Sequence, residues 1–120
     1  MRYQEGEGDI PGTVKHAQFH ISNYVLMAMD SSGQHAFTFN EGASIVVNCE
    51  SQEEIDNYWS RLTEGGEEGR CGWLKDRYGV SWQIVPSVLG KLLSDPAKSD
   101  RVLQAFMKMK KFDIKTLENA

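Results

Sequence analysis

Two histidines, His16 and His20, stand four residues apart in the N-terminal part of the chain. Residues 14–21 follow a two-residue period, and the even spacing predicts that both imidazoles share one face of a strand. Imidazole binds metals and titrates near neutral pH, so the pair could hold a divalent metal or act as an acid and a base. A solvent-facing strand or a subunit interface would explain the same spacing without chemistry, because the sequence fixes no acidic partner.

A second set of candidate residues follows from the alternation of side chains in the second half of the chain. Residues 43–49 and the hairpin predicted at 71–86 read as strands, and packing Trp82 and Ile84 into a core turns Gln83 to the opposite face. That face mixes polar groups with an apolar wall, as small-molecule pockets do, although a partly wet dimer interface would look alike. The residues assigned to a ligand-binding cleft are Ser44, Asn48, Trp73 and Gln83, with Ser81 and Val46 on the same face.

The glycines at positions 65, 66 and 69 do not indicate a phosphate-binding loop. They follow a predicted helix, whereas phosphate loops precede one, and they enclose Glu67 and Glu68, whose carboxylates repel phosphate. We expect a flexible turn there. Cys49 and Cys71 have no neighbouring Cys or His, so we expect two reduced, packed thiols and neither a zinc site nor a disulfide scaffold.

The clearest of the elements that would position these residues is a helix at 51–62. Ser51 and Glu54 have the spacing of a capping box, in which each side chain bonds a free backbone N–H of the first turn. An apolar stripe with helical spacing follows at Ile55, Tyr58, Trp59 and Leu62. The order strand, helix, strand, strand predicts an α+β fold with this helix against one face of a sheet.

The flanking segments carry weaker signals. Ser22 and Asn23 predict the turn of a hairpin with arms at 14–21 and 24–30, and residues 2–4 could add a short strand. After the sheet we expect a short helix around 88–93, a longer helix from an Asp95 N-cap to about residue 111, and one more turn capped by Asp113. The lysines near residue 110 are read as a dipole-matched helix end rather than as a phosphate- or nucleic-acid-binding site.

Composition narrows the possible partners. A chain of 120 residues suits one domain, and its 40% hydrophobic content is enough to build a core. The net charge of −4 gives no global basic field, so we do not expect nucleic acid as a partner. No apolar run approaches the roughly 20 residues of a membrane span and the start lacks the apolar core of a signal peptide, so we expect no membrane partner and a cytoplasmic location.

Four motifs of the second half occur together: residues 44–50 (SIVVNCE), Tyr58-Trp59, residues 71–76 (CGWLKD) and residues 81–86 (SWQIVP). With them the chain resembles, over nearly its whole length, the PhnB-like branch of the vicinal oxygen chelate superfamily, which includes glyoxalase I, the bleomycin-resistance proteins and the extradiol dioxygenases. Members of the branch are often labelled 3-demethylubiquinone-9 3-methyltransferase. Because no strand here leads into a glycine-rich loop with an acidic ribose ligand, we take that label as a family name rather than a mechanism.

The resemblance implies a glyoxalase-like fold of paired βαβββ modules, whose cleft holds a divalent metal in the active members. Residues 1–42 would form a partial first module, residues 43–86 a complete second module and residues 87–120 a tail of helices. The family pattern supplies a strand and a helix ahead of the segment that matches Arg2 and Tyr3. We therefore expect either a truncated chain or a partner chain that fills the gap.

The resemblance also implies where a metal would bind. Ser44 and Gln83 stand where the family has a His and a Glu, Asp30 lies near another ligand position, and neutral side chains are weak ligands for a transition metal. We expect a homodimeric small-molecule-binding protein without a complete metal site. The alternatives are a metal-dependent lyase, isomerase or dioxygenase that uses His16, His20 or Asp30, and a purely structural dimer module.

Overall fold

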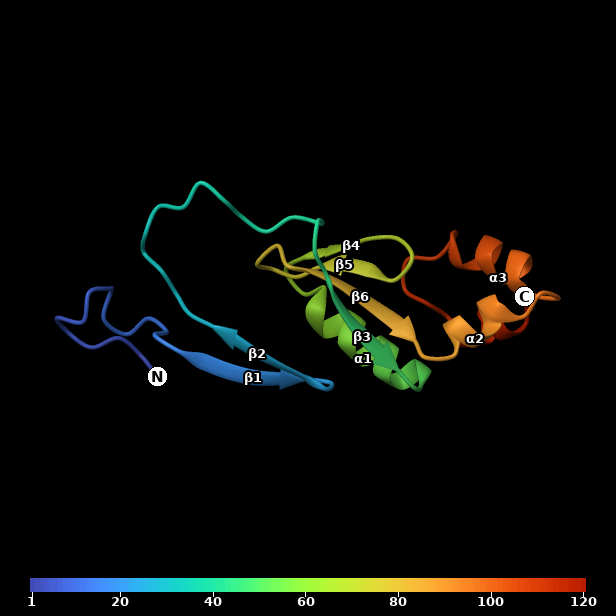
Figure 1. Cartoon of the computed structure of the whole chain (residues 1–120), viewed down its shortest axis with the longest axis horizontal. Helices are drawn as coiled ribbons and strands as arrows, with labels where there is room; N and C mark the ends of the chain where they lie inside the picture. Colours follow the sequence, from blue (N-terminus) through green and yellow to red (C-terminus); the bar gives the residue numbers. More distant parts are fainter. The chain divides into compact units, whose positions relative to one another are not determined.

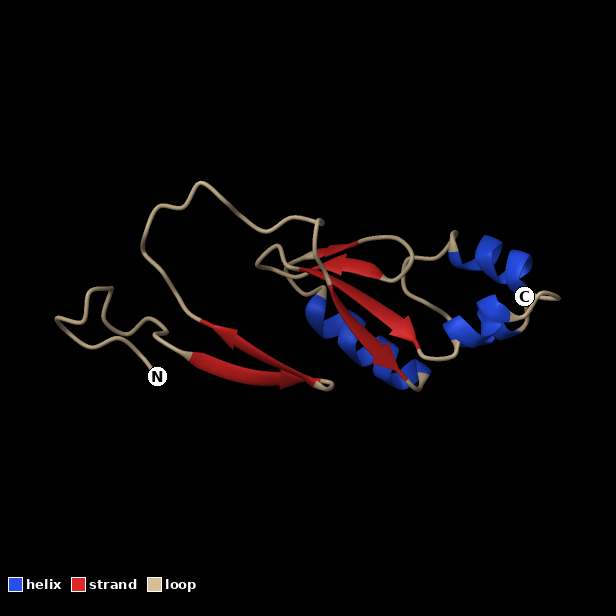
Figure 2. Cartoon of the chain, viewed as in Figure 1, coloured by secondary structure: helices blue, strands red, loops and turns tan.

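A β-hairpin is the regular structure of the N-terminal part of the chain (Figures 1 and 2). The computed structural model describes all 120 residues, which fall into two units, Met1–Phe37 and Thr38–Ala120. In the first unit, β1 (Ala17–Ile21) pairs antiparallel with β2 (Tyr24–Ala28). Ser22, in the turn between them, has a positive φ of 52°. The predicted hairpin and its turn are confirmed, whereas one domain with module boundaries after residues 42 and 86 stays a prediction.

The strand predicted from residue 14 is shorter than expected. The N–H of Val14 donates to Oδ2 of Asp30 at 2.7 Å, and Val14 forms only an isolated bridge with Arg2. The carbonyl oxygen of Val14 still accepts the backbone N–H of Asp30, but the N–H groups of Lys15 and His16 donate to the carbonyl oxygen of Met1, so the regular ladder with β2 begins only at Ala17. His16 therefore precedes β1, His20 lies within it, and the strand predicted at residues 2–4 is reduced to that bridge.

The second unit contains a four-stranded mixed sheet with the order β3-β6-β5-β4. Its chain order is β3 (Ile45–Cys49), α1 (Gln52–Leu62), β4 (Glu67–Glu68), β5 (Trp73–Lys75) and β6 (Ser81–Pro86). β3 runs parallel to β6, while β5 pairs antiparallel with both β6 and β4. The right-hand part of Figure 1 shows this βαβββ arrangement, which confirms the predicted α+β fold class.

Helix α1 forms where its cap and its apolar stripe predict it. The hydroxyl of Ser51 accepts a hydrogen bond from the backbone N–H of Glu54 at 3.2 Å, which satisfies one of the free donors of the first turn. Ile55 and Trp59 are buried and face the sheet, where Val47, Leu74, Trp82 and Ile84 are buried with them. One face of the sheet and one stripe of α1 therefore make the core of this region.

The turn expected at residues 65–69 instead contains strand β4. Glu67 lies opposite Lys75 and Glu68 opposite Leu74 in the ladder with β5. Glu68 accepts a hydrogen bond from the indole Nε1 of Trp59 at 2.8 Å, so α1 holds this strand from one side. A side chain at Gly66 would collide with the carbonyl oxygen of Lys75, and the close approach of the two strands explains the glycine there.

Three short helices complete the unit: α2 (Leu89–Ser94), α3 (Ser99–Phe106) and α4 (Ile114–Glu118). The prediction of one long helix from Asp95 to about residue 111 is wrong. The Asp95 carboxylate accepts from the N–H of Ala97 at 2.9 Å and forms a turn, so α3 begins only at Ser99 and ends at Phe106. The capping role predicted for Asp113 is confirmed by its bond to the N–H of Thr116 at 2.8 Å.

The side chain of Gln52 ties the C-terminal segment to the start of α1. Its amide nitrogen donates to the carbonyl oxygen of Phe112 at 2.9 Å, and its oxygen accepts from the N–H of Ile114 at 2.9 Å. Phe112 is fully buried and lies close to Gly72, where a side chain would collide with the ring. Among the helices of the chain, none is long and apolar enough to cross a membrane.

Candidate functional site

The face of the sheet that points away from α1 carries the predicted cleft residues. The register places Gln83 of β6 between Val46 of β3 and Trp73 of β5, so these three side chains form one row across the sheet. Val46, Trp73 and Gln83 are all half-buried. An apolar wall with one amide at its centre therefore occupies the middle of this face, as the alternation of side chains predicts.

Ser44 and Gln83 are in direct contact. The amide nitrogen of Gln83 donates to Oγ of Ser44 at 2.9 Å. The hydroxyl proton of Ser44 and the amide oxygen of Gln83 are then available to other partners. Asn48 is exposed and lies four residues further along β3, roughly 13 Å from Ser44 at about 3.3 Å per residue. The structure brings three of the four predicted cleft residues together and places Asn48 at the far end of the face.

A second row of side chains lies next to the first, toward the start of β3. Ser81 of β6 pairs with Lys75 of β5, and Lys75 pairs with Glu67 of β4. Extending the β3–β6 register by one residue places Ser44 beside Ser81. Ser81 is only 2% exposed, and its hydroxyl is the one buried side-chain polar atom without a hydrogen-bond partner.

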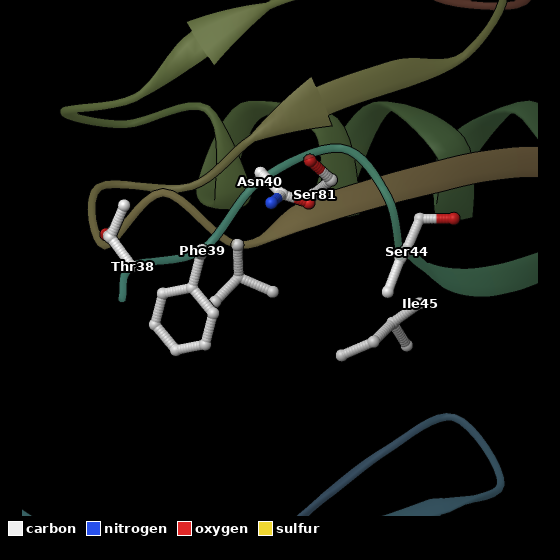
Figure 3. A pocket seen from close by; sticks show the side chains of 8 residues that line it. Thr38, Phe39, Asn40, Ser44, Ile45 and Ser81 are labelled. Carbon is white, nitrogen blue, oxygen red and sulfur yellow. The ribbon is translucent and has the colours of Figure 1, made fainter. Parts of the chain in front are cut away.

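Two cavities meet at Ser81. The first has a volume of about 370 Å³ and is lined by Ser81 and Ser44 together with residues of the segment before β3, among them Thr38, Phe39 and Asn40. Figure 3 shows that segment running beside Ser81. The second cavity, of about 220 Å³, lies on the other side and is lined by Trp73, Lys75, Glu41 and Glu67 among others.

Lys75 is the positively charged residue that lines the second cavity. Its Nζ forms an ion pair with the carboxylate of Glu41, and the charge of Glu67 lies nearby. The hydrogen bond to Lys75 lowers the pKa of Glu41 from its ordinary value, and the same bond raises the pKa of Lys75. The pair is thus fully ionised at neutral pH, and it is lost as the pH falls through the lowered pKa of Glu41.

Comparison with known proteins identifies the family. The sequence profile of the 3-demethylubiquinone-9 3-methyltransferase family matches residues 1–85. The chain belongs to this family. The PhnB protein from Bacillus cereus is 37% identical, with a TM-score of 0.66 over 72% of this chain and 75% of that one. A protein from Pseudomonas aeruginosa is 25% identical, with a TM-score of 0.57 over 69% and 70% of the two chains. None of the curated proteins compared with the chain matches it.

These matches confirm the predicted membership of the PhnB-like branch. The family resemblance implies a divalent metal in active members, with ligand positions that correspond here to Ser44 and Gln83, two neutral side chains that are hydrogen-bonded to each other. A hydroxyl and an amide are weak ligands for a transition metal, so this donor set does not fit one. The chain has no group of three or more His, Cys, Asp or Glu side chains that could hold a metal ion.

The weaker metal candidates belong to the N-terminal unit. His16 and His20 are exposed, and the carboxylate of Asp30 accepts the N–H of Val14.

In the second unit Cys49 is fully buried, and burial raises its pKa to about 11, so it is a neutral, packed thiol at physiological pH.

Sequence reasoning missed Glu41 and Lys75, and placed Ser81 on the right face without a role. The alternation of side chains along β5 and β6 could have predicted that Lys75 and Ser81 are neighbours, because they flank the turn at residues 77–79 and pair across the hairpin. Glu41 lies in an irregular segment, for which no periodic pattern predicts a neighbour.

Proposed function

We propose that this member of the PhnB-like family is a small-molecule-binding protein that holds its ligand on the sheet face opposite α1, without a resident metal. The observation that carries the proposal is the hydrogen bond between Gln83 and Ser44. It replaces a metal-ligand pair with a neutral donor–acceptor pair beside Val46 and Trp73. A few polar groups set into an apolar wall are the usual composition of a ligand pocket.

The available atoms indicate how a ligand would be held. The hydroxyl of Ser44 donates, the amide oxygen of Gln83 accepts, and the indole of Trp73 offers an aromatic surface beside them. A ligand with a flat apolar body and one polar edge matches this arrangement. Such a site binds and orients a molecule, and it needs no Lewis acid to do so.

The family name does not carry a methyl-transfer mechanism to this chain. β3 leads into α1 through Glu50 and the capping Ser51, where a nucleotide-binding strand would lead into a glycine-rich loop. Binding is therefore the function that the geometry supports best. The cytoplasmic location and the homodimer expected from the sequence stay predictions.

A ligand screen followed by substitution tests the proposal. We expect Gln83→Ala and Ser44→Ala to weaken a bound ligand by about 1 to 3 kcal/mol, because a buried hydrogen-bond partner is lost. Gln104→Ala, on an exposed position of α3, is the matched control and should leave the affinity unchanged. Trp73 fluorescence reports the binding. An affinity that stays unchanged in both Gln83→Ala and Ser44→Ala would contradict the proposed site.

Metal analysis tests the second half of the proposal. The purified protein should contain much less than one equivalent of zinc, nickel or iron, and a chelator should leave its melting temperature unchanged. Stoichiometric metal that disappears in His16→Ala or His20→Ala would instead support a metal-dependent enzyme.

A further inference from the structure

The hydroxyl of Ser81 is buried without a partner at the meeting point of two cavities. A buried hydroxyl that lacks a hydrogen bond destabilises the free protein, because folding removes it from water and gives nothing in return. Replacing serine by alanine would remove that cost without changing the size of the side chain much. The group is thus placed to bond something that the free chain does not contain.

The neighbour of Ser81 across the ladder is Lys75, and their β-carbons lie about 5 Å apart on the same face. The cavity that they line together also contains Glu41, whose carboxylate is paired with Lys75. The side chains of Lys75 and Glu41 are 37% and 56% exposed. Ion pairs this exposed contribute little to stability, so another carboxylate can exchange with Glu41 at small cost.

We propose that Ser81 and Lys75 form a subsite for the carboxylate of a ligand. In the free protein the carboxylate of Glu41 occupies the place of the ligand beside Lys75. The carboxylate of a small-molecule ligand would displace Glu41 from Lys75 and accept a hydrogen bond from the hydroxyl of Ser81. The proposal rests on the proposed binding function, since the ligand body would lie over the row of Val46, Gln83 and Trp73, which adjoins Ser81 and Lys75 in the register. After this exchange Lys75 still has one carboxylate partner, while the carboxylate of Glu41, already 56% exposed, is released to solvent.

The surrounding charges select a monoanion. Glu67 is the ladder partner of Lys75 on the other side, and its carboxylate repels a second negative charge. A phosphate dianion would meet this repulsion with only one cation to offset it. A carboxylate carries a single charge and has two oxygens, one for Lys75 and one for Ser81.

Matched pairs of acids and amides test the subsite in the full-length protein. The probes are benzoate with benzamide, phenylacetate with phenylacetamide, and butyrate with butyramide. Titrations are followed by the backbone amide NMR signals of Lys75, Ser81 and Glu41. We expect the acids to bind at least ten times more tightly than their amides. Equal binding of acids and amides, or no shift of these signals by any acid, would overturn the subsite.

Three substitutions sharpen the test. Glu41→Gln removes the carboxylate that competes for Lys75 and should raise the affinity for the acids several-fold. Lys75→Met should abolish the preference for acids over amides. Ser81→Ala should weaken the acids several-fold and leave the melting temperature equal or higher, which a merely structural serine would not do. Glu53→Gln, an exposed carboxylate on α1, is the control for Glu41→Gln and should change nothing. Weaker binding of acids by Glu41→Gln would also overturn the proposal.

The Gln83→Ala variant separates this inference from the proposed function. If acids and amides bind equally and both depend on Gln83, the carboxylate subsite is wrong and the proposed ligand face stands. If the binding of acids depends on Lys75 but is unchanged in Gln83→Ala, the subsite stands and the proposed ligand face is wrong.

Discussion

Neighbouring residues of β6 have opposite roles, because the side chains of a strand alternate between its two faces. Trp82 points to α1, is 4% exposed and donates its indole N–H to Oδ2 of Asp76 at 2.9 Å. Gln83 points to the other face and bonds Ser44. Asp76 also accepts the backbone N–H groups of Tyr78 and Val80, so one carboxylate fixes both the hairpin turn and the tryptophan.

We expect this difference to appear in the stability of two variants. Trp82→Ala should lower the free energy of unfolding by about 3 to 5 kcal/mol, the range for a buried aromatic residue truncated to alanine. Gln83→Ala should lower it much less, because its side chain is half-buried and makes one hydrogen bond, to the hydroxyl of Ser44. Denaturant unfolding measures both. A tolerated Trp82→Ala together with an unfolded Gln83→Ala would reverse the two faces and remove the basis of the ligand site.

At the level of elements, the C-terminal segment depends on the first residue of α1. The two hydrogen bonds of the Gln52 side chain reach Phe112 and Ile114, which lie 60 and 62 residues away in the sequence. Backbone bonds from Cys71 to Met109 and from Gly72 to Lys110 hold the same segment against the start of β5. The loop before α4 is therefore fastened from the helix side and from the sheet side.

We predict that Gln52→Ala loosens this connection. It leaves a carbonyl and an N–H of the C-terminal segment without partners, which should cost about 1 to 3 kcal/mol of stability. Hydrogen exchange should become faster in residues 109–120 while the exchange of β6 changes little. Glu53→Ala, at the next and exposed position, serves as control. Unchanged exchange in residues 109–120 would show that the backbone bonds suffice.

At the scale of the whole molecule, each of the two units carries apolar side chains that its own packing does not bury. In the hairpin, Val25 and Met27 are 51% and 70% exposed, and Phe19 is 41% exposed. A two-stranded hairpin is at best marginally stable in water, and exposed apolar side chains of this size favour association. In the second unit, Val46 and Trp73 are half-buried on the face opposite α1.

We predict a homodimer on this basis. Pairing of two copies is a frequent way to cover sheet edges and apolar faces at once. Light scattering at micromolar concentration should give twice the mass of the chain, and Met27→Lys should shift the equilibrium toward the monomer. A monodisperse monomer of the unaltered chain would contradict the prediction.

Local patterns in the sequence were sufficient for much of the second unit. The bond between Ser51 and Glu54, the burial of Ile55 and Trp59, and the opposite faces of Trp82 and Gln83 all depend on residues at most a few positions apart. For the same reason the hairpin turn at Ser22 and the cap at Asp113 could be predicted. Short-range sterics and hydrogen bonds decide these features, and the sequence states them directly.

Tertiary structure decided the features that depend on distant partners. Glu67 and Glu68 form a strand because β5 and Trp59 are beside them, and the helix predicted from Asp95 begins at Ser99 because the Asp95 carboxylate closes a turn instead. The contact of Gln83 with Ser44, the pairing of Lys75 with Glu41 and the unpartnered hydroxyl of Ser81 join residues from separate strands and an irregular segment. Such contacts depend on strand register and on the path of a loop, which local propensity and periodicity do not determine.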